Sequence, residues 1–137
     1  MPRAVLDTNV LVSALIGPGG PSATLLLELR AGAFELVACP LLLAELREVL
    51  GRDKFRRYVT EAEAVACVDL IRHESTILDD PAPGTRPLSA DPDDEYLVDL
   101  ARAATADVLV SGDAHLLDLR GRLPVMTPAE FLAALSD

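Results

Sequence analysis

The chain has few of the basic residues that are typical of proteins with a broad nucleic-acid-binding surface. Its 137 residues contain 12 Lys and Arg against 22 Asp and Glu, and the formal net charge is −10 at pH 7. Lysine occurs once, at Lys54. This balance argues against broad electrostatic attraction to nucleic acid. It does not exclude a local site, because acids gathered around bound cations are neutralised there.

Cysteine and histidine are scarce as well, with two residues of each. Cys39 and Cys67 lie in apolar segments, and neither has a second cysteine at C-x-x-C spacing. We interpret both as buried small hydrophobic residues in a reducing compartment. His73 is expected near the end of a helix. His115 is expected in a loop close to other polar residues, where a place at the margin of a site is the alternative, and for both histidines we favour a structural role. A zinc site built from His and Cys is therefore not expected.

Long hydrophobic runs are absent too. No segment reaches the roughly 18 uninterrupted apolar residues that a membrane-spanning helix needs. The first apolar run is interrupted by Asp7 and Asn9 and is not followed by a signal-peptide cleavage site. We therefore expect a cytoplasmic protein without a membrane segment. The length is typical of one domain over residues 1–137, and 50% of the residues are hydrophobic, which is enough for a core.

Short apolar runs alternate with segments of helical periodicity. The expected strands cover residues 3–7, 34–39, 75–79, 107–113 and 123–127. The expected helices cover residues 9–16, 22–32, 40–50, 60–73, 91–106 and 128–137, with a further short helix starting in the basic run near residue 52. This alternation predicts an α/β fold in which helices cover both faces of a central parallel sheet of four to five strands. Ligands in such folds bind beyond the C-terminal ends of the strands.

Three single acids stand at or near that edge of the predicted sheet. Asp7 ends the first strand, although it would equally serve as a turn and helix N-cap. Glu45 borders the apolar stripe of its helix, where it needs a cation, several N–H donors or a proton, whereas Glu48 points more to solvent. A salt-bridged position at the edge of the stripe is the alternative for Glu45. Asp113 follows the fourth strand and could be a plain Gly-Asp turn.

A fourth acidic position lies in the sequence DPDDE at residues 91–95. Asp91 before Pro92 is typical of a helix N-cap with proline at the first helical position. Periodicity alone does not separate Asp93 from Asp94 as the acid on the inward face. Carboxylates that converge from all four positions would repel one another unless they bind divalent cations. Oxygen ligands favour Mg²⁺ or Mn²⁺ over zinc.

Four segments in this order resemble the motifs of PIN-domain proteins, and together they cover nearly the whole chain. They are VLDTNVLVSAL at 5–15, PLLLAELREVL at 40–50, DPDDEYLVDLA at 91–101 and DVLVSGDAHLL at 107–117. The chain is most similar to the small, stand-alone prokaryotic members classed as toxins of type II toxin–antitoxin pairs. The resemblance implies an α/β/α sandwich and a metal-dependent ribonuclease that hydrolyses RNA phosphodiester bonds. It also implies a cognate antitoxin partner and a homodimer.

The resemblance further implies a set of site residues and one or two Mg²⁺ or Mn²⁺ ions. The family pattern places Leu three and Ala seven residues after the third acid, which selects Asp94 because Leu97 and Ala101 follow it. The family leaves open whether Asp91 also touches a metal or only caps the helix. The expected metal-binding and catalytic acids are Asp7, Glu45, Asp94 and Asp113, and the expected residues that support them without binding the ion are Asn9 and Ser111.

The only concentrated basic run lies at residues 52–57 and offers a place for the RNA backbone. Its basic residues are Arg52, Lys54, Arg56 and Arg57. Phe55 inside the run would either stack on a base or, as we favour, pack into the protein. The alternative for the whole run is a solvated helix face.

The sequence fits other functions less well than that of a ribonuclease. Aspartyl phosphatases need a second Asp two residues after the first, where this chain has Asn9, and a receiver domain needs a lysine after its last strand, whereas Lys54 lies elsewhere. The segment GPGGPS lacks the Gly-Lys-Ser/Thr of a nucleotide-binding loop. A non-catalytic PIN-like binding module is the alternative of a different class, and the presence of all four acids weighs against it.

Overall fold

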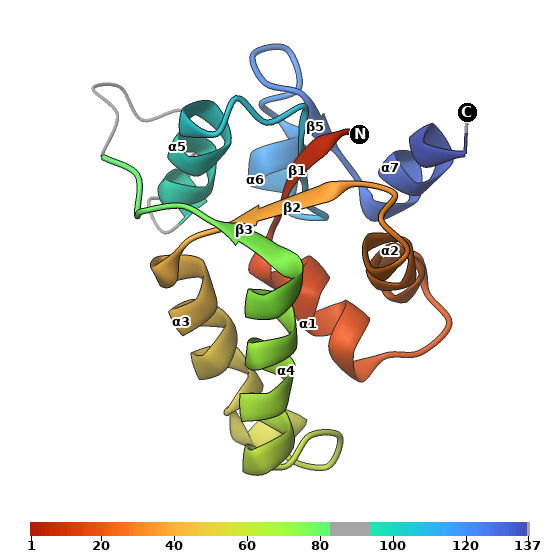
Figure 1. Cartoon of the computed structure of the whole chain (residues 1–137), viewed down its shortest axis with the longest axis vertical. Helices are drawn as coiled ribbons and strands as arrows, with labels where there is room; N and C mark the ends of the chain where they lie inside the picture. The colour runs from red at the N-terminus through yellow and green to blue at the C-terminus, as the bar shows by residue number, and fades with distance from the viewer. Residues whose placement is uncertain (83–93, 137) are drawn as a thin grey trace.

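The computed structural model describes residues 1–82 and 94–136. Asp91 and Asp93 lie outside the described residues, so the roles considered for them stay predictions. The described part contains five strands: β1 (Arg3–Leu6), β2 (Glu35–Ala38), β3 (Ser75–Ile77), β4 (Val108–Val110) and β5 (Val125–Met126). They form one parallel sheet in the order β3-β2-β1-β4-β5 (Figure 1). The predicted parallel sheet is therefore confirmed.

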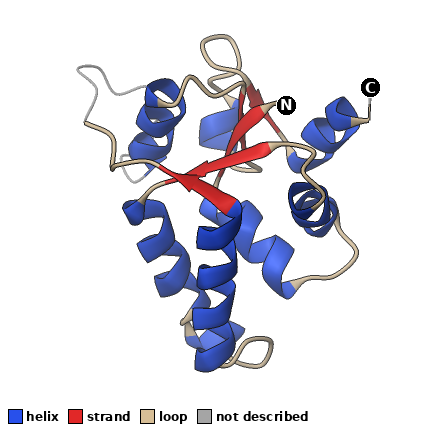
Figure 2. Ribbon diagram, in the orientation of Figure 1, coloured by secondary structure: helices blue, strands red, loops and turns tan. Residues whose placement is uncertain are grey.

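Helices cover both faces of this sheet (Figure 2). The described helices are α1 (Thr8–Ile16), α2 (Pro21–Arg30), α3 (Pro40–Leu50), α4 (Glu61–Glu74), α5 (Glu95–Ala103), α6 (Ala114–Leu117) and α7 (Pro128–Leu135). One layer is continuous, because α1 packs on α2 and α3, α2 on α7, and α3 on α4. In contrast, α5 packs directly on β1 and β4. The predicted α/β/α architecture is confirmed.

Local signals in the sequence account for most of the helix boundaries. Thr60 and Glu63 form the predicted capping box at the start of α4, with the Glu63 N–H bound to Thr60 Oγ1 and the Thr60 N–H bound to Glu63 Oε1. Proline stands at the first helical position of α3, as predicted. Gly32 closes the turn after α2 with a φ of +83°, a conformation that glycine adopts without steric cost.

The innermost strands are buried on both faces. β1 and β4 consist almost entirely of buried aliphatic residues, and they pair in parallel with Leu6 opposite Val110. Such continuous hydrophobic strands are what a parallel sheet covered by helices requires. The sheet and the helices on both sides share one hydrophobic core. The C-terminal edge of the sheet is thereby held in a fixed position.

Three local predictions differ from the structure. His115 lies in the short helix α6 and not in a loop, because the Asp113 side chain caps that helix by accepting from the His115 N–H at 2.8 Å. The short helix in the basic run is a 3₁₀ turn of three residues, Asp53–Phe55. The helix predicted over 91–106 has its described α-helical part at Glu95–Ala103, and it ends where Thr105 takes a φ of +52°.

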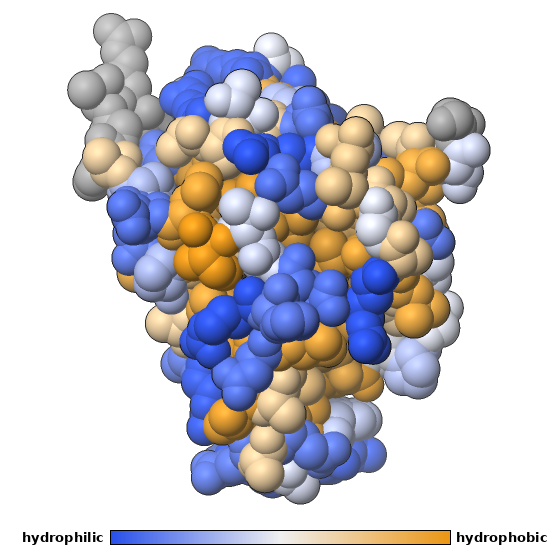
Figure 3. Space-filling view, in the orientation of Figure 1, coloured by the Kyte–Doolittle hydropathy of each residue, from blue (hydrophilic) through white to orange (hydrophobic). Residues whose placement is uncertain are grey.

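The surface on the side of β3 and α4 mixes polar and apolar character. Figure 3 shows hydrophobic and hydrophilic residues alternating over this face. Val65 and Ile77 are among the large hydrophobic residues exposed there. Within the described residues no single helix is long and apolar enough to cross a bilayer, and α1 with α2 reaches that length and composition only as a pair bent by 91°.

Candidate functional site

The sheet topology brings the end of β1 next to the end of β4. Because the two strands run in parallel with Leu6 opposite Val110, the residues that follow each strand meet at the same edge. The Asp7 N–H continues this pairing and donates to the Val110 carbonyl at 2.9 Å. Asp7 and Ser111, which are far apart in the sequence, therefore lie side by side.

Asp7 is a buried carboxylate with only 3% of its surface exposed. Its Oδ2 accepts a hydrogen bond of 2.8 Å from Ser111 Oγ, and its Oδ1 accepts one of 3.4 Å from the Asn9 N–H. Burial raises the pKa of Asp7 above its ordinary value, and the charge of Asp113 adds to the rise, while the bonds from Ser111 and Asn9 oppose it. The ionised form of Asp7 would therefore be stabilised by a nearby cation.

Ser111 connects Asp7 with the acid that follows β4. The Ser111 side chain is fully buried. Its hydroxyl oxygen accepts a hydrogen bond from the Asp113 N–H at 2.9 Å, and its O–H donates one to Asp7 Oδ2. One hydroxyl thus uses its donor and an acceptor position to hold both residues. The Asp113 side chain in turn accepts from the His115 N–H, and the His115 Nδ1 lies 3.6 Å from Asp113 Oδ1.

Asp94 joins this group from the start of α5. It is the N-cap residue of α5, the helix that packs on β1 and β4. Single ligand atoms of Asp94, Asp113 and His115 all lie within 4.8 Å of one another. Two carboxylates and an imidazole therefore converge beside the buried Asp7. Asp7 and Asp113 interact electrostatically as well as through Ser111.

Glu45 is connected to this region through a tyrosine. It stands on α3 in a partly buried position, and its Oε2 accepts a hydrogen bond from the Tyr96 hydroxyl on α5. Burial, and then the bond to Glu45, raise the pKa of Tyr96 well above its ordinary value, so the phenol stays protonated and acts as the donor. Tyr96 comes two residues after Asp94. The Glu45 carboxylate is thereby tied to the start of α5.

The structure brings the basic run into two different environments. Arg52 forms an ion pair with Glu48 at 2.9 Å, and Arg56 forms one with Glu61 at 3.5 Å. Lys54 and Arg57 instead lie over aromatic rings, at 5.0 Å from the centroid of Phe55 and 5.3 Å from that of Tyr58. Phe55 itself is half-buried and packs partly against the core. The predicted basic residues thus do not behave as one uniform patch.

Two residues here, His115 and Tyr96, are not among the site residues expected from the sequence. The sequence favours a structural role for His115 over a place at the margin of a site, yet its position two residues after Asp113, at the start of a helix capped by that acid, is a signal that could have placed it there. Tyr96 follows the acidic cluster directly, but its partner Glu45 is 51 residues away. Only the packing of α3 and α5 in the fold reveals that pair.

The donor set fits a divalent cation. Carboxylate oxygens are the ligands preferred by Mg²⁺ and Mn²⁺. Asp94, Asp113 and His115 offer two carboxylates and one nitrogen within mutual reach, and Asp7 contributes a buried negative charge next to them. A cation held there would offset the repulsion among these acids. An imidazole nitrogen suits transition-metal ions such as Mn²⁺ better than Mg²⁺.

Known proteins resemble this chain in sequence pattern and in fold. A family model described as PIN domain matches residues 3–115. VapBC2 from Rickettsia felis, in a crystal structure bound to a DNA fragment from their promoter, shares 18% identity with a TM-score of 0.65, over 91% of this chain and 98% of that chain. PAE2754 from Pyrobaculum aerophilum shares 18% identity with a TM-score of 0.68, over 98% of this chain and 96% of that chain.

No curated protein sequence matches the chain. At 18% identity the two structures show a common fold and nothing further. The family model is the stronger finding, because it covers most of the chain, from β1 through Asp113 to His115. The chain therefore belongs to the PIN-domain family.

Proposed function

We propose that this protein is an endoribonuclease that depends on Mg²⁺ or Mn²⁺ and hydrolyses RNA phosphodiester bonds. The observation that supports the proposal most is the convergence of Asp94, Asp113 and His115 beside the buried Asp7 at the C-terminal edge of the sheet. Membership of the PIN-domain family, whose members are generally nucleases, supports the same reaction class. The proposed catalytic acids are Asp7, Glu45, Asp94 and Asp113.

Each residue of this group has a distinct task in the proposal. Asp7, Glu45, Asp94 and Asp113 would hold one or two ions, and His115 would add a nitrogen ligand beside Asp94 and Asp113. Ser111 and the Asn9 N–H orient Asp7, and Tyr96 orients Glu45. A bound divalent cation would stabilise the charge that develops on the phosphate oxygens and make water easier to deprotonate at neutral pH.

The biological role that we propose is that of the toxin in a type II toxin–antitoxin pair. The resemblance to stand-alone prokaryotic PIN proteins supports it, and one similar structure is a VapBC2 complex bound to promoter DNA. A net charge of −10 would suit a basic antitoxin segment. By the same resemblance we expect a homodimer, and light scattering that shows a monomer at working concentration would contradict this expectation.

RNA cleavage with and without Mg²⁺ or Mn²⁺ tests the proposed activity. We expect the wild type to cut RNA only with the ion, and Asp7→Asn and Asp94→Asn to lose at least about 100-fold in rate, because charge stabilisation is worth several kcal/mol in such sites. Asp69→Asn is the matched control, since Asp69 is an exposed acid on α4 that pairs with Arg72. A wild type that cuts nothing, or site variants that cut as well as Asp69→Asn, would refute the assignment and favour a binding module.

A further inference from the structure

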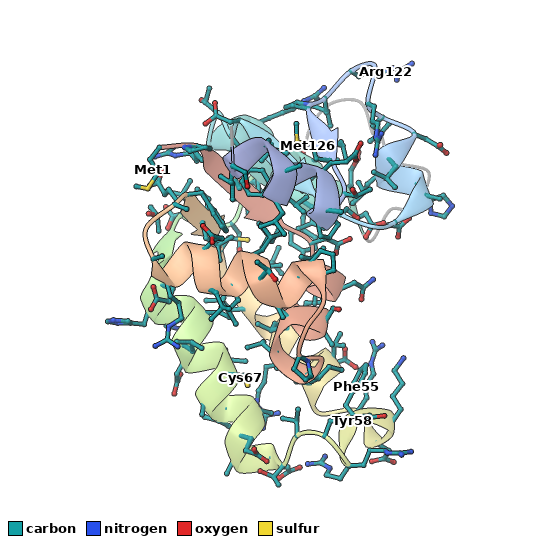
Figure 4. The ribbon with its side chains drawn as sticks, turned by 90° about the vertical axis from the view of Figure 1, so that its right-hand side faces the viewer. Met1, Phe55, Tyr58, Cys67, Arg122 and Met126 are labelled. Carbon is teal, nitrogen blue, oxygen red and sulfur yellow. The ribbon has the colours of Figure 1, made fainter. Side chains whose placement is uncertain are left out.

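The Thr8 side chain is polar, yet it is almost completely buried, with 1% of the residue exposed. Polar side chains usually project away from the ribbon, as Arg122 does (Figure 4). The Thr8 hydroxyl has no partner at hydrogen-bonding geometry in the described part of the chain. A buried hydroxyl without such a partner lowers the stability of a fold, so its retention calls for a physical explanation.

Thr8 stands between two elements of the proposed site. It follows Asp7 directly and is the first residue of α1. Its side chain interacts with the Tyr96 hydroxyl on α5. Burial and the bond to Glu45 raise the pKa of Tyr96, whereas hydrogen bonding from Thr8 opposes this rise. The two hydroxyls therefore lie near each other, although the bond between them is not well aligned.

A bond from Thr8 would act on Glu45 through Tyr96. The Tyr96 oxygen can accept a hydrogen bond while its own proton is donated to Glu45. A hydroxyl that accepts a hydrogen bond becomes a stronger donor, because the bonds in such a chain polarise one another. The chain from Thr8 through Tyr96 to Glu45 would join α1, α5 and α3 in the interior of the protein.

We infer that Thr8 is a positioning residue of the metal site, which donates to Tyr96 and so fixes the Glu45 carboxylate when a divalent ion is bound. The inference rests on the proposed metal dependence. Asp7 caps α1, Asp94 caps α5 and Glu45 lies on α3, so an ion held by these acids fixes the three helices relative to one another. Thr8 is one residue from Asp7 and Tyr96 two from Asp94. The contacts that hold the ion therefore also align the two hydroxyls.

Stability without ions tests the first half of this inference. Thr8→Val keeps the branched shape of the side chain and removes only the hydroxyl. In EDTA its Tm should not fall, because the hydroxyl makes no aligned bond in the ion-free protein. The matched control is Thr76→Val, which should lower Tm by about 3–5 °C because Thr76 Oγ1 donates to Glu35 at 2.9 Å. An equal fall in both variants would give Thr8 an ordinary structural bond and overturn the inference.

Calorimetric titration with Mn²⁺ tests the second half. Thr8→Val should bind Mn²⁺ about tenfold more weakly, an effect typical of residues that orient a ligand from behind. Thr8→Ser keeps the hydroxyl and should bind Mn²⁺ nearly as tightly as the wild type. In a Tyr96→Phe background, Thr8→Val should cause little further loss, because the chain is already broken at Tyr96. The full loss in that background as well would show that Thr8 does not act through Tyr96.

The outcomes separate this inference from the proposed function. Weaker Mn²⁺ binding in Thr8→Val that Thr8→Ser restores supports the role of Thr8 even if the protein cuts no RNA, and the ribonuclease function then fails alone. Unchanged Mn²⁺ affinity in Thr8→Val overturns the role of Thr8 even if RNA is cleaved. A wild type that binds neither Mn²⁺ nor Mg²⁺ would refute both.

Discussion

Ser111 Oγ donates a hydrogen bond of 2.8 Å to Oδ2 of Asp7, although the two residues are 104 positions apart in the sequence. The same oxygen accepts from the Asp113 N–H at 2.9 Å. One buried hydroxyl therefore joins the residue that ends β1 to the acid that follows β4. The relative position of Asp7 and Asp113, two proposed catalytic acids, depends on this side chain. Removing the Ser111 hydroxyl tests this dependence.

Ser111→Ala should lower the free energy of unfolding by about 1–3 kcal/mol, because a buried carboxylate loses its donor and the Asp113 N–H loses its acceptor. Chemical denaturation measures the change. The control is the same substitution in an Asp7→Asn background, where the bond is no longer charge-assisted. There the cost should be smaller, and an equal cost in both backgrounds would show that Ser111 does not act through Asp7.

Asp7→Asn should stabilise the ion-free protein. Because burial raises the pKa of Asp7, ionising it costs more in the folded than in the unfolded state, so stability is lost as pH rises from about 4 through the raised pKa. The variant lacks this loss and should be more stable at pH 7 by about 1 kcal/mol, or roughly 3–5 °C in Tm. Thermal melts in EDTA between pH 4 and 8 measure it. A difference between the two proteins that does not vary with pH would contradict this account.

His115→Ala should weaken Mn²⁺ binding by about tenfold and Mg²⁺ binding by less, because an imidazole nitrogen contributes more to a transition-metal ion. Calorimetric titration with each ion measures both affinities. The matched control is His73→Ala, which removes the chain's other histidine from the exposed last turn of α4. Equal losses for the two ions, or none for either, would place His115 outside the donor set.

Tyr96→Phe should reduce RNA cleavage about tenfold, since residues that hydrogen-bond a ligating carboxylate usually contribute that much. The substitution keeps the ring and removes only the hydroxyl that donates to Glu45. Single-turnover rates measure the effect, with Tyr58→Phe as the control for loss of a tyrosine hydroxyl. If Tyr96 acts through Glu45, adding Tyr96→Phe to Glu45→Gln should cost little more. An additive loss would assign Tyr96 a separate task.

Much of the fold could be predicted because its signals are local. The aliphatic runs of β1 and β4, Pro40 at the start of α3 and the capping box of Thr60 with Glu63 each act within a few residues. The helix α6 is not predicted from the sequence, although its signal is local as well. It begins because Asp113 caps it, but an Asp after glycine is equally typical of a plain turn.

The sequence by itself determined that the strands form a parallel sheet, and therefore the edge at which Asp7 and Asp113 meet. It could do so because side-chain period and the alternation of strands and helices are properties of neighbouring residues. Only the tertiary structure decided which side chains contact one another at that edge. Ser111 on Asp7, Tyr96 on Glu45, and His115 beside Asp94 join elements separated by long stretches of chain. Such contacts depend on how whole helices pack against the sheet, and no local pattern in the sequence contains that information.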